Sequence, residues 1–272
     1  MISLLKTDLK RILKDKLFMI TLIIAVVLSC TTPLLYKAML ALNGVEDMFG
    51  AFGMQINAKS IFFECFLPSS NSGLIVPILI GIILFKDYSY GTIRNKIIIG
   101  KKRSSIYFSS FIATSITICA IILIQAILAL LIALIFFNYQ QTPFTGADFG
   151  YLMLSVLFEI LVYILISALI CFLCVWAKNL GLIIVGYVGV SMLFSIIGGV
   201  IMGVVGVSQM AGKEPNKFLE ILSNINIFTS NLIGSGTTYT LENLLYILLP
   251  IIFGTAILTA LSIILFNKKD IK

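Results

Sequence analysis

The stretch GYLMLSVLFEILVYILISALICFLCVW, residues 150–176, decides the fold class of this chain. Its only acidic or basic side chain is Glu159. As a helix rising about 1.5 Å per residue, it can cross the roughly 30 Å hydrocarbon core of a bilayer. Further apolar stretches of this kind lie at about residues 17–36, 70–85, 106–137, 180–206 and 243–266. In lipid a segment must satisfy its own backbone hydrogen bonds. The sequence therefore predicts an all-α polytopic membrane protein, with six transmembrane helices in a single domain, 1–272.

The composition excludes an ordinary soluble protein. Hydrophobic residues make up 60% of the chain and charged residues 11%, with a mean hydropathy of +1.10. A soluble domain carries roughly 25% charged residues. The net charge of +7 would suggest a nucleic-acid partner in a soluble protein. Here the placement of the cations explains the charge, so no nucleic-acid partner is expected.

Most of the 19 Lys and Arg lie in segments that six alternating spans place on one side of the membrane. These segments are residues 1–16, the loop 86–105, the short loop at Lys178 and the residues after 266. The cations on the other side are Lys37, Lys59, Lys213 and Lys217. The positive-inside rule puts the larger group, and hence both termini, in the cytoplasm. Usage rich in Ile, Lys and Asn fits a low-GC bacterium, so the bacterial cytoplasmic membrane is the predicted location.

Residues 1–16 predict a helix lying in the cytoplasmic membrane interface. One helical face carries the apolar residues Ile2, Leu5, Leu9, Ile12 and Leu13, and most of the basic residues lie around the other face. A lipoprotein signal peptide is the rival interpretation, because VLSC at 27–30 weakly resembles a cleavage box. The apolar run continues past Cys30 to Tyr36, which favours a first span instead.

Two predicted external segments, 37–69 and 207–242, are longer than connectors need to be. The first is unusually apolar and contains Met48, Phe49, Phe52, Phe62 and Phe63. We expect it either to pack on the outer ends of the spans or to form a surface that meets lipid or an amphipathic substrate.

The cytoplasmic loop 86–105 carries the main functional signal. Asp87 stands at the membrane exit, and Thr92 of the pair Gly91-Thr92 is placed to cap a short helix. Ile93, Ile97 and Tyr90 would share one face of that helix, Arg94 would lie within it, and Gly100 would end it. A short amphipathic helix of this kind suits docking into a groove on a cytoplasmic partner. The alternative is a basic membrane anchor without a partner.

With Asp87, Gly91-Thr92, Gly100 and Arg103 in this order before a span, the loop resembles the first cytoplasmic loop of type-2 ATP-binding-cassette permeases. These are membrane-spanning subunits of exporters. The interfacial N-terminal helix, the six spans and the long segment before the last span match as well, so the resemblance covers nearly the whole chain. The sequence departs from the family pattern at Gly100-Lys101, where many relatives have proline.

The resemblance implies partners and residue roles. The loop helix would be the coupling helix, which inserts into a separate ATPase subunit. The residues that would serve this coupling are Asp87, Tyr90, Gly91, Thr92, Ile93, Arg94, Ile97 and Arg103. The ATPase subunit would bind ATP and Mg, so this chain would bind no cofactor itself. Two permease chains, identical or sister chains, would pair around a pathway, and the segment after the fifth span would form short helices re-entering the outer leaflet.

Enzyme classes fit the sequence poorly, and no catalytic residue is expected. Gly212-Lys213 lacks the first glycine and the Ser or Thr of a phosphate-binding loop. The chain has no histidine, which argues against metal-dependent and serine intramembrane proteases, and Glu159 alone does not make an aspartyl pair. Cys171 and Cys174 form a C-x-x-C inside a span, which we interpret as apolar core rather than as a metal or redox site.

Two residue sets inside the spans are candidates for a pathway or a dimer seam. The first is a stripe of small residues, Ser191, Ser195, Gly199 and Gly203, whose other interpretation is packing within the chain. The second is Glu159, which needs a partner such as Tyr163 or Gln125 and either makes a structural hydrogen bond or faces the pathway. The alternatives to an exporter are an ion-coupled secondary transporter and a non-transporting anchor or immunity subunit. Among substrates, the apolar outer segment favours an amphipathic peptide or drug.

Overall fold

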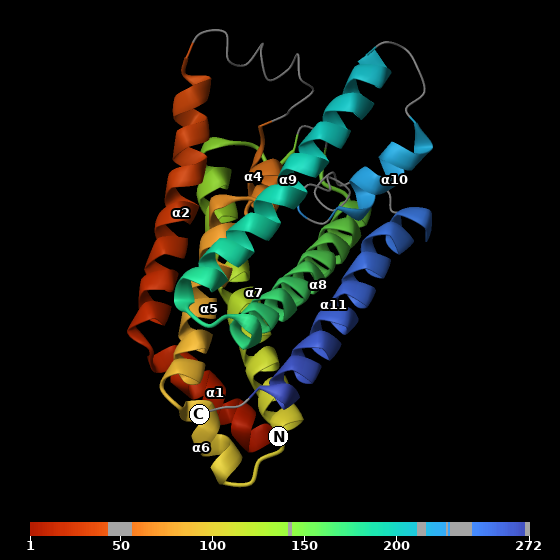
Figure 1. Cartoon of the computed structure of the whole chain (residues 1–272). Coiled ribbons are helices and arrows are strands. Elements are labelled where there is room, and N and C mark those ends of the chain that lie inside the picture. Colours follow the sequence, from red (N-terminus) through yellow and green to blue (C-terminus); the bar gives the residue numbers. More distant parts are fainter. Residues whose placement is uncertain (43–55, 141–142, 211–215, 227, 229–240, 270–272) are drawn as a thin grey trace.

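The computed structural model describes residues 1–42, 56–140, 143–210, 216–226, 228 and 241–269, which form ten helices and no strand. Six of them are long and apolar enough to cross a membrane: α2 (Lys16–Leu40), α5 (Asn71–Ser89), α7 (Arg103–Phe136), α8 (Gly146–Trp176), α9 (Leu180–Met210) and α11 (Leu241–Lys268). The shorter helices are α1 (Ile2–Lys14), α4 (Ala58–Glu64), α6 (Thr92–Ile98) and α10 (Lys217–Ile225) (Figure 1). The predicted all-α membrane fold with six spans is confirmed.

The observed helices extend beyond most of the apolar stretches that predicted them. The second span, predicted at 70–85, continues to Ser89, so Lys86 and Asp87 lie on α5 rather than in the loop. Hydropathy marks the part of a helix that can sit in lipid, whereas the helix itself continues until its end is capped.

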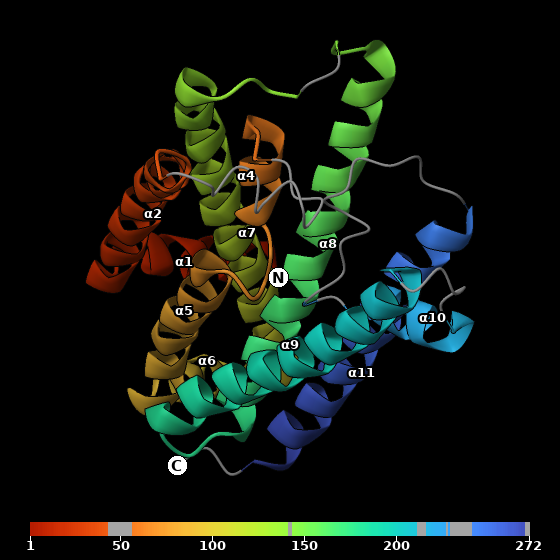
Figure 2. The same cartoon turned by 90° about the horizontal axis from the view of Figure 1, so that it is seen from above.

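Helix α8 forms the centre of the bundle. It packs against α5, α7, α9 and α11 and is the most buried of the six spans. Figure 2 looks down the bundle, with α8 between α7 and α11. Helix α2 packs on α7 and α5, whereas α9 and α11 turn large apolar side chains such as Leu193 and Phe253 outward. An apolar outer surface of this kind is what a bilayer requires of a spanning helix.

Helix α1 lies across the end of the bundle that also carries α6 (Figure 1). Leu5, Leu9 and Ile12 pack against the hydrophobic core of the protein, chiefly on the side of α7, whereas Ile2 and Leu13 are exposed. The predicted apolar face exists, but most of it contacts protein. Only its edge is left for lipid, because the body of the bundle covers the rest.

The described part of the predicted external segment 37–69 packs onto the bundle. Asn57 caps α4 through reciprocal hydrogen bonds with Ser60, and the rings of Phe62 and Phe63 are buried. The Ala58 amide donates a hydrogen bond to the carbonyl oxygen of Asn138 at 3.0 Å. This part of the segment is therefore packed against the spans. Residues 43–55 lie outside the described residues.

Helix α5 runs without interruption through Pro77. Proline has no amide hydrogen, so it cannot bond the carbonyl of Gly73 four residues earlier. The Tyr187 hydroxyl of α9 donates to this carbonyl at 2.7 Å. Gly73 also has to be glycine, because a Cβ there would lie 2.4 Å from the carbonyl oxygen of Leu67. Helix α9 therefore supplies the hydrogen bond that Pro77 removes.

A short amphipathic helix, α10, precedes the last span and packs on α9 and α11. Its position is compatible with the predicted short-helix segment between the fifth and sixth spans. The rest of that segment, residues 211–215 and 229–240, lies outside the described residues, including the glycine-lysine pair at 212–213.

Candidate functional site

The loop after α5 folds as a sharp turn, the short helix α6 and a second sharp turn. Gly91 precedes α6 with a φ of +72°, a left-handed conformation that favours glycine. It occupies the N-cap position without a side-chain hydrogen bond, so the prediction that Thr92 caps the helix is wrong. Thr92 is instead the first helical residue.

Gly100 forms the end of α6. Gly100 has a φ of +84°. Its amide donates to the Ile97 carbonyl at 2.9 Å, and the Lys101 amide donates to the Lys96 carbonyl at 3.2 Å. This pair of hydrogen bonds is a Schellman motif, which closes a helix through a left-handed residue that is usually glycine. Gly100 therefore ends the helix, as predicted.

The face of α6 that was predicted to meet a partner packs against the protein's own hydrophobic core instead. Ile93 is 1% exposed and belongs to the hydrophobic core, and Ile97 is partly buried against the same core. The exposed apolar side chains are Tyr90, Ile98 and Ile99, at 78%, 72% and 75%. The Ile93 and Ile97 face therefore attaches α6 to its own chain, and any partner would meet the other face.

Three ion pairs join α1 to α5 and α6. The buried Asp8 carboxylate accepts hydrogen bonds from Lys96 Nζ at 2.5 Å and from Ser109 Oγ at 2.6 Å. Arg11 pairs with Asp87, and Lys86 Nζ donates to both carboxylate oxygens of Asp15 at 2.9 and 3.0 Å. A buried carboxylate without a cation costs several kcal/mol, so these pairs hold the three elements in one arrangement.

Asp8 was not among the predicted site residues, although the sequence holds a signal for it. It lies three residues after Leu5 and four before Ile12, on the apolar face of α1. An acid at such a position needs a partner. The predicted coupling residue Asp87 is likewise buried, and its pair with Arg11 gives it a positioning contact inside the chain.

Arg103 and Lys269 fasten the end of α11 to this region. Arg103 Nη1 donates to the carbonyl oxygens of Phe266, Asn267 and Lys269 at 2.9, 2.9 and 3.0 Å. A cation at this point complements the partial negative charge of a helix C-terminus. Lys269 Nζ in turn donates to the Val175 carbonyl at 2.6 Å. Of the predicted coupling cations, Arg94 is exposed and, within the described part of the chain, makes no ion pair.

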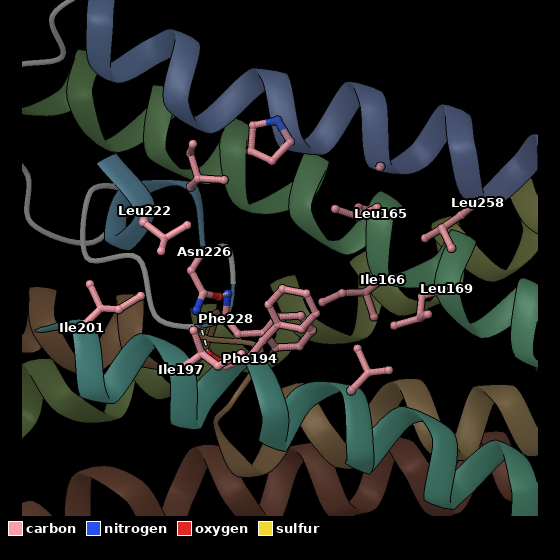
Figure 3. Close-up of a pocket in the computed structure, with 14 residues that line it drawn as sticks. Leu165, Ile166, Leu169, Phe194, Ile197, Ile201, Leu222, Asn226, Phe228 and Leu258 are labelled. Carbon is pink, nitrogen blue, oxygen red and sulfur yellow. Dashed lines mark hydrogen bonds between the residues drawn. The ribbon is translucent and has the colours of Figure 1, made fainter. Parts of the chain in front are cut away.

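A second candidate region is an apolar cavity of about 390 Å³ between α8, α9, α10 and α11 (Figure 3). Its walls include Leu165, Phe194 and Leu258, and its one amide side chain is Asn226. Asn226 Nδ2 donates to the Phe194 carbonyl at 2.7 Å, and the ring of Phe228 stacks on that of Phe194 at 5.6 Å. Sequence reasoning missed this cavity, because it depends on how the four successive helices α8 to α11 pack in three dimensions.

The predicted stripe of small residues on α9 is divided between two environments. Ser191 is buried and Ser195 half-buried, but Gly199 and Gly203 are exposed. A Cβ placed at either glycine would meet no atom within 4 Å. The outer half of the stripe is therefore not used for packing within this chain.

Glu159 is 4% exposed, and neither predicted partner reaches it. The Tyr163 hydroxyl donates instead to the Phe66 carbonyl at 3.0 Å, and Gln125 lines a cavity together with residues of α2, α4 and α5. Among the described residues, no hydrogen bond or ion pair involves the Glu159 carboxyl group. The prediction of a Tyr163 or Gln125 partner is wrong, and the pathway hypothesis stays a prediction.

Among the described residues, no group of three or more His, Cys, Asp or Glu side chains is placed to hold a metal ion. The C-x-x-C residues Cys171 and Cys174 are buried free thiols, and Cys174 Sγ donates to the Gly81 carbonyl at 3.5 Å. These contacts are those of packed core residues.

No protein-family model matches the chain, and no curated protein matches its sequence. The fold and the composition define it as a polytopic, all-helical membrane protein with six candidate spans.

Proposed function

We propose that this chain is the membrane-spanning subunit of an ATP-driven exporter and that α6 docks a separate ATPase subunit, which carries ATP and Mg. The observation behind this proposal is a short helix that its own chain holds on one face and that bears exposed Tyr90, Ile98 and Ile99 on the other. A cluster of exposed large apolar side chains on a loop is a feature of surfaces that bind a partner. The positive-inside rule supports a cytoplasmic position for this end.

In this proposal, the ion pairs would transmit movement of the docking helix α6 to the rest of the bundle. Movement of α6 would be transmitted to α1 through Lys96 and Asp8, and to α7 through Asp8 and Ser109. Residues Asp87 and Arg103 would act as positioning residues, while Tyr90, Arg94, Ile98 and Ile99 would touch the ATPase. The predicted contact through Ile93 and Ile97 is replaced by this second set.

A second permease chain belongs to the proposal. The exposed Gly199 and Gly203 on α9 would let the backbone of a neighbouring helix approach closely. The substrate class we favour is an amphipathic peptide or drug, whose apolar part suits the cavity between α8 and α11.

The test is co-expression with candidate ABC ATPase subunits from the same genome. The double variant Ile98→Asp, Ile99→Asp should lose the ATPase on purification while the permease remains monodisperse. Leu42→Asp is the matched control, because Leu42 is 63% exposed at the opposite end of the bundle. An ATPase that still copurifies with the double variant would contradict the docking assignment.

An ion-coupled secondary transporter is the second candidate, and the observation that favours it is the buried Glu159. An acid inside a span is a feature of proton relays, and the described residues offer Glu159 no hydrogen-bond or ion-pair partner. Transport into vesicles that lack ATP but carry a proton gradient would favour this candidate, and ATP-dependent transport that survives loss of the gradient would reject it.

A further inference from the structure

A second cavity, of about 470 Å³, lies between α2, α4, α7 and the start of α5, in the half of the bundle away from α6. Leu28, Leu35 and Met39 of α2 form its apolar side. Its polar side includes Tyr36, Glu64 and Gln125, together with Thr32, Asn71 and three serines. The volume lies in the range of sites for small organic ligands. A carboxyl group, an amide group and apolar side chains therefore line the same cavity.

Two acceptors on the polar side, the Glu64 carboxyl group and Gln125 Oε1, have unused hydrogen-bonding capacity, whereas the Thr32 and Ser69 hydroxyls that also line the cavity donate to backbone carbonyls. The Tyr36 hydroxyl donates to Glu64 Oε2 at 2.7 Å, which uses one acceptor site of the carboxylate. Gln125 is 2% exposed, and its Oε1 is buried without a hydrogen-bond partner among the described residues. A buried acceptor left unpaired costs about 1–3 kcal/mol, so a donor is favoured here.

The site also lacks a cation. Within the described part of the chain no Lys or Arg pairs with Glu64. The sequence of residues 43–55, which follows α2, contains no Lys or Arg either. Burial raises the pKa of Glu64, and the Tyr36 hydroxyl only partly opposes this. A positively charged ligand would supply the missing charge.

We propose that this cavity binds the primary ammonium group of an amphipathic amine. The ammonium group would donate to Glu64 and to Gln125 Oε1, and the hydrocarbon tail would lie along Leu28, Leu35 and Met39. Ammonium carries three N–H donors and one charge, which matches both the unpaired acceptor and the uncompensated acid. This binding does not depend on the proposed ATPase partner.

The amine has two possible sources, a water-soluble amphiphile or the headgroup of an ethanolamine phospholipid. The purified full-length chain in phosphatidylcholine nanodiscs can be titrated calorimetrically with hexylammonium. We expect saturable binding of one hexylammonium per chain. Added phosphatidylethanolamine that raises the apparent Kd identifies the lipid as a source, and an unchanged Kd identifies the soluble amine.

The variants separate the proposed contacts from general partitioning into lipid. Glu64→Gln should weaken hexylammonium binding at least about tenfold, and Asp148→Asn, which removes a half-buried acid at the start of α8 near the same end, should leave it unchanged. Hexyltrimethylammonium, which has no N–H, should bind at least about tenfold more weakly than hexylammonium. If Glu64→Gln does not fold, Gln125→Leu and the cavity-filling Thr32→Phe serve in its place. Non-saturable uptake, or a Kd in these variants within twofold of the wild type, overturns the proposal.

Discussion

Lys96 Nζ lies 2.5 Å from Oδ1 of Asp8, although the two residues are 88 positions apart in the sequence. One belongs to α6 and the other to α1. Asp8 is almost fully buried and accepts a second hydrogen bond from Ser109 of α7. The pair is therefore the point at which the loop helix, the N-terminal helix and a long span meet.

Replacing Lys96 with Met should lower the free energy of unfolding by about 3 kcal/mol, because it leaves the buried Asp8 carboxylate with only the longer contact to Arg11, at 3.8 Å. Chemical unfolding of the purified chain in detergent measures this loss. Lys101→Met is the control, since Lys101 is exposed and its side chain makes no ion pair in the described residues. The double variant Asp8→Asn, Lys96→Met should recover part of the loss. An equal loss in the double variant would contradict the pairing.

Ile93→Ala should destabilise the chain by about 2–5 kcal/mol, because it removes buried methyl and methylene groups from the core. Ile99→Ala should change stability by less than about 0.5 kcal/mol, because Ile99 is 75% exposed. Thermal unfolding of both variants provides the comparison. Similar stabilities for the two would show that α6 does not attach through Ile93.

Tyr187→Phe should cost about 1 kcal/mol, because it removes the donor to the Gly73 carbonyl that Pro77 leaves free. In a Pro77→Ala background the Ala amide can bond that carbonyl itself, so the same Tyr187 change should cost less. Unfolding of the four proteins in this cycle measures the coupling. Additive effects would mean that Tyr187 and Pro77 act independently.

Lowering the pH should release the contact between Asp15 and Lys86. Burial alone would raise the pKa of Asp15, but hydrogen bonds from Lys86 and the Leu17 amide, with the charges of Lys86 and Arg11, outweigh it and lower the pKa below its usual 3.8. A depressed folded-state pKa gives stability that is fully present above the unfolded value and lost as pH falls through the folded value. The free energy of unfolding, measured from pH 5 to pH 2, should fall less steeply in Lys86→Met than in the wild type. The variant has already lost the ion pair between Asp15 and Lys86. Identical slopes would contradict this assignment.

The six spans could be predicted from local sequence, because an apolar stretch such as 150–176 must form a helix in lipid, whichever helices it packs against. Gly100 as a helix end was predictable for the same reason, since glycine acts on its own backbone. The face of α6 was not predictable. Ile93 and Ile97 show that a helix has an apolar face, but whether that face meets its own chain or a partner depends on α1 and α7. The cavities and the solitary Glu159 likewise depend on helices that meet only in three dimensions.

The Asp8 and Lys96 contact also constrains how the protein is made. Lys96 is synthesised 88 residues after Asp8, which takes roughly 4 to 18 s at bacterial rates of about 5–20 residues per second. During this interval two spans enter the membrane while the N-terminal helix still lacks its counter-charge. Once Lys96 has paired with Asp8, contacts within about the first 110 residues hold α1, α6 and the start of α7 together. The fourth span then inserts beside these helices. A substitution at Asp8 would thus act first on membrane insertion, as a defect in yield visible before any defect in activity.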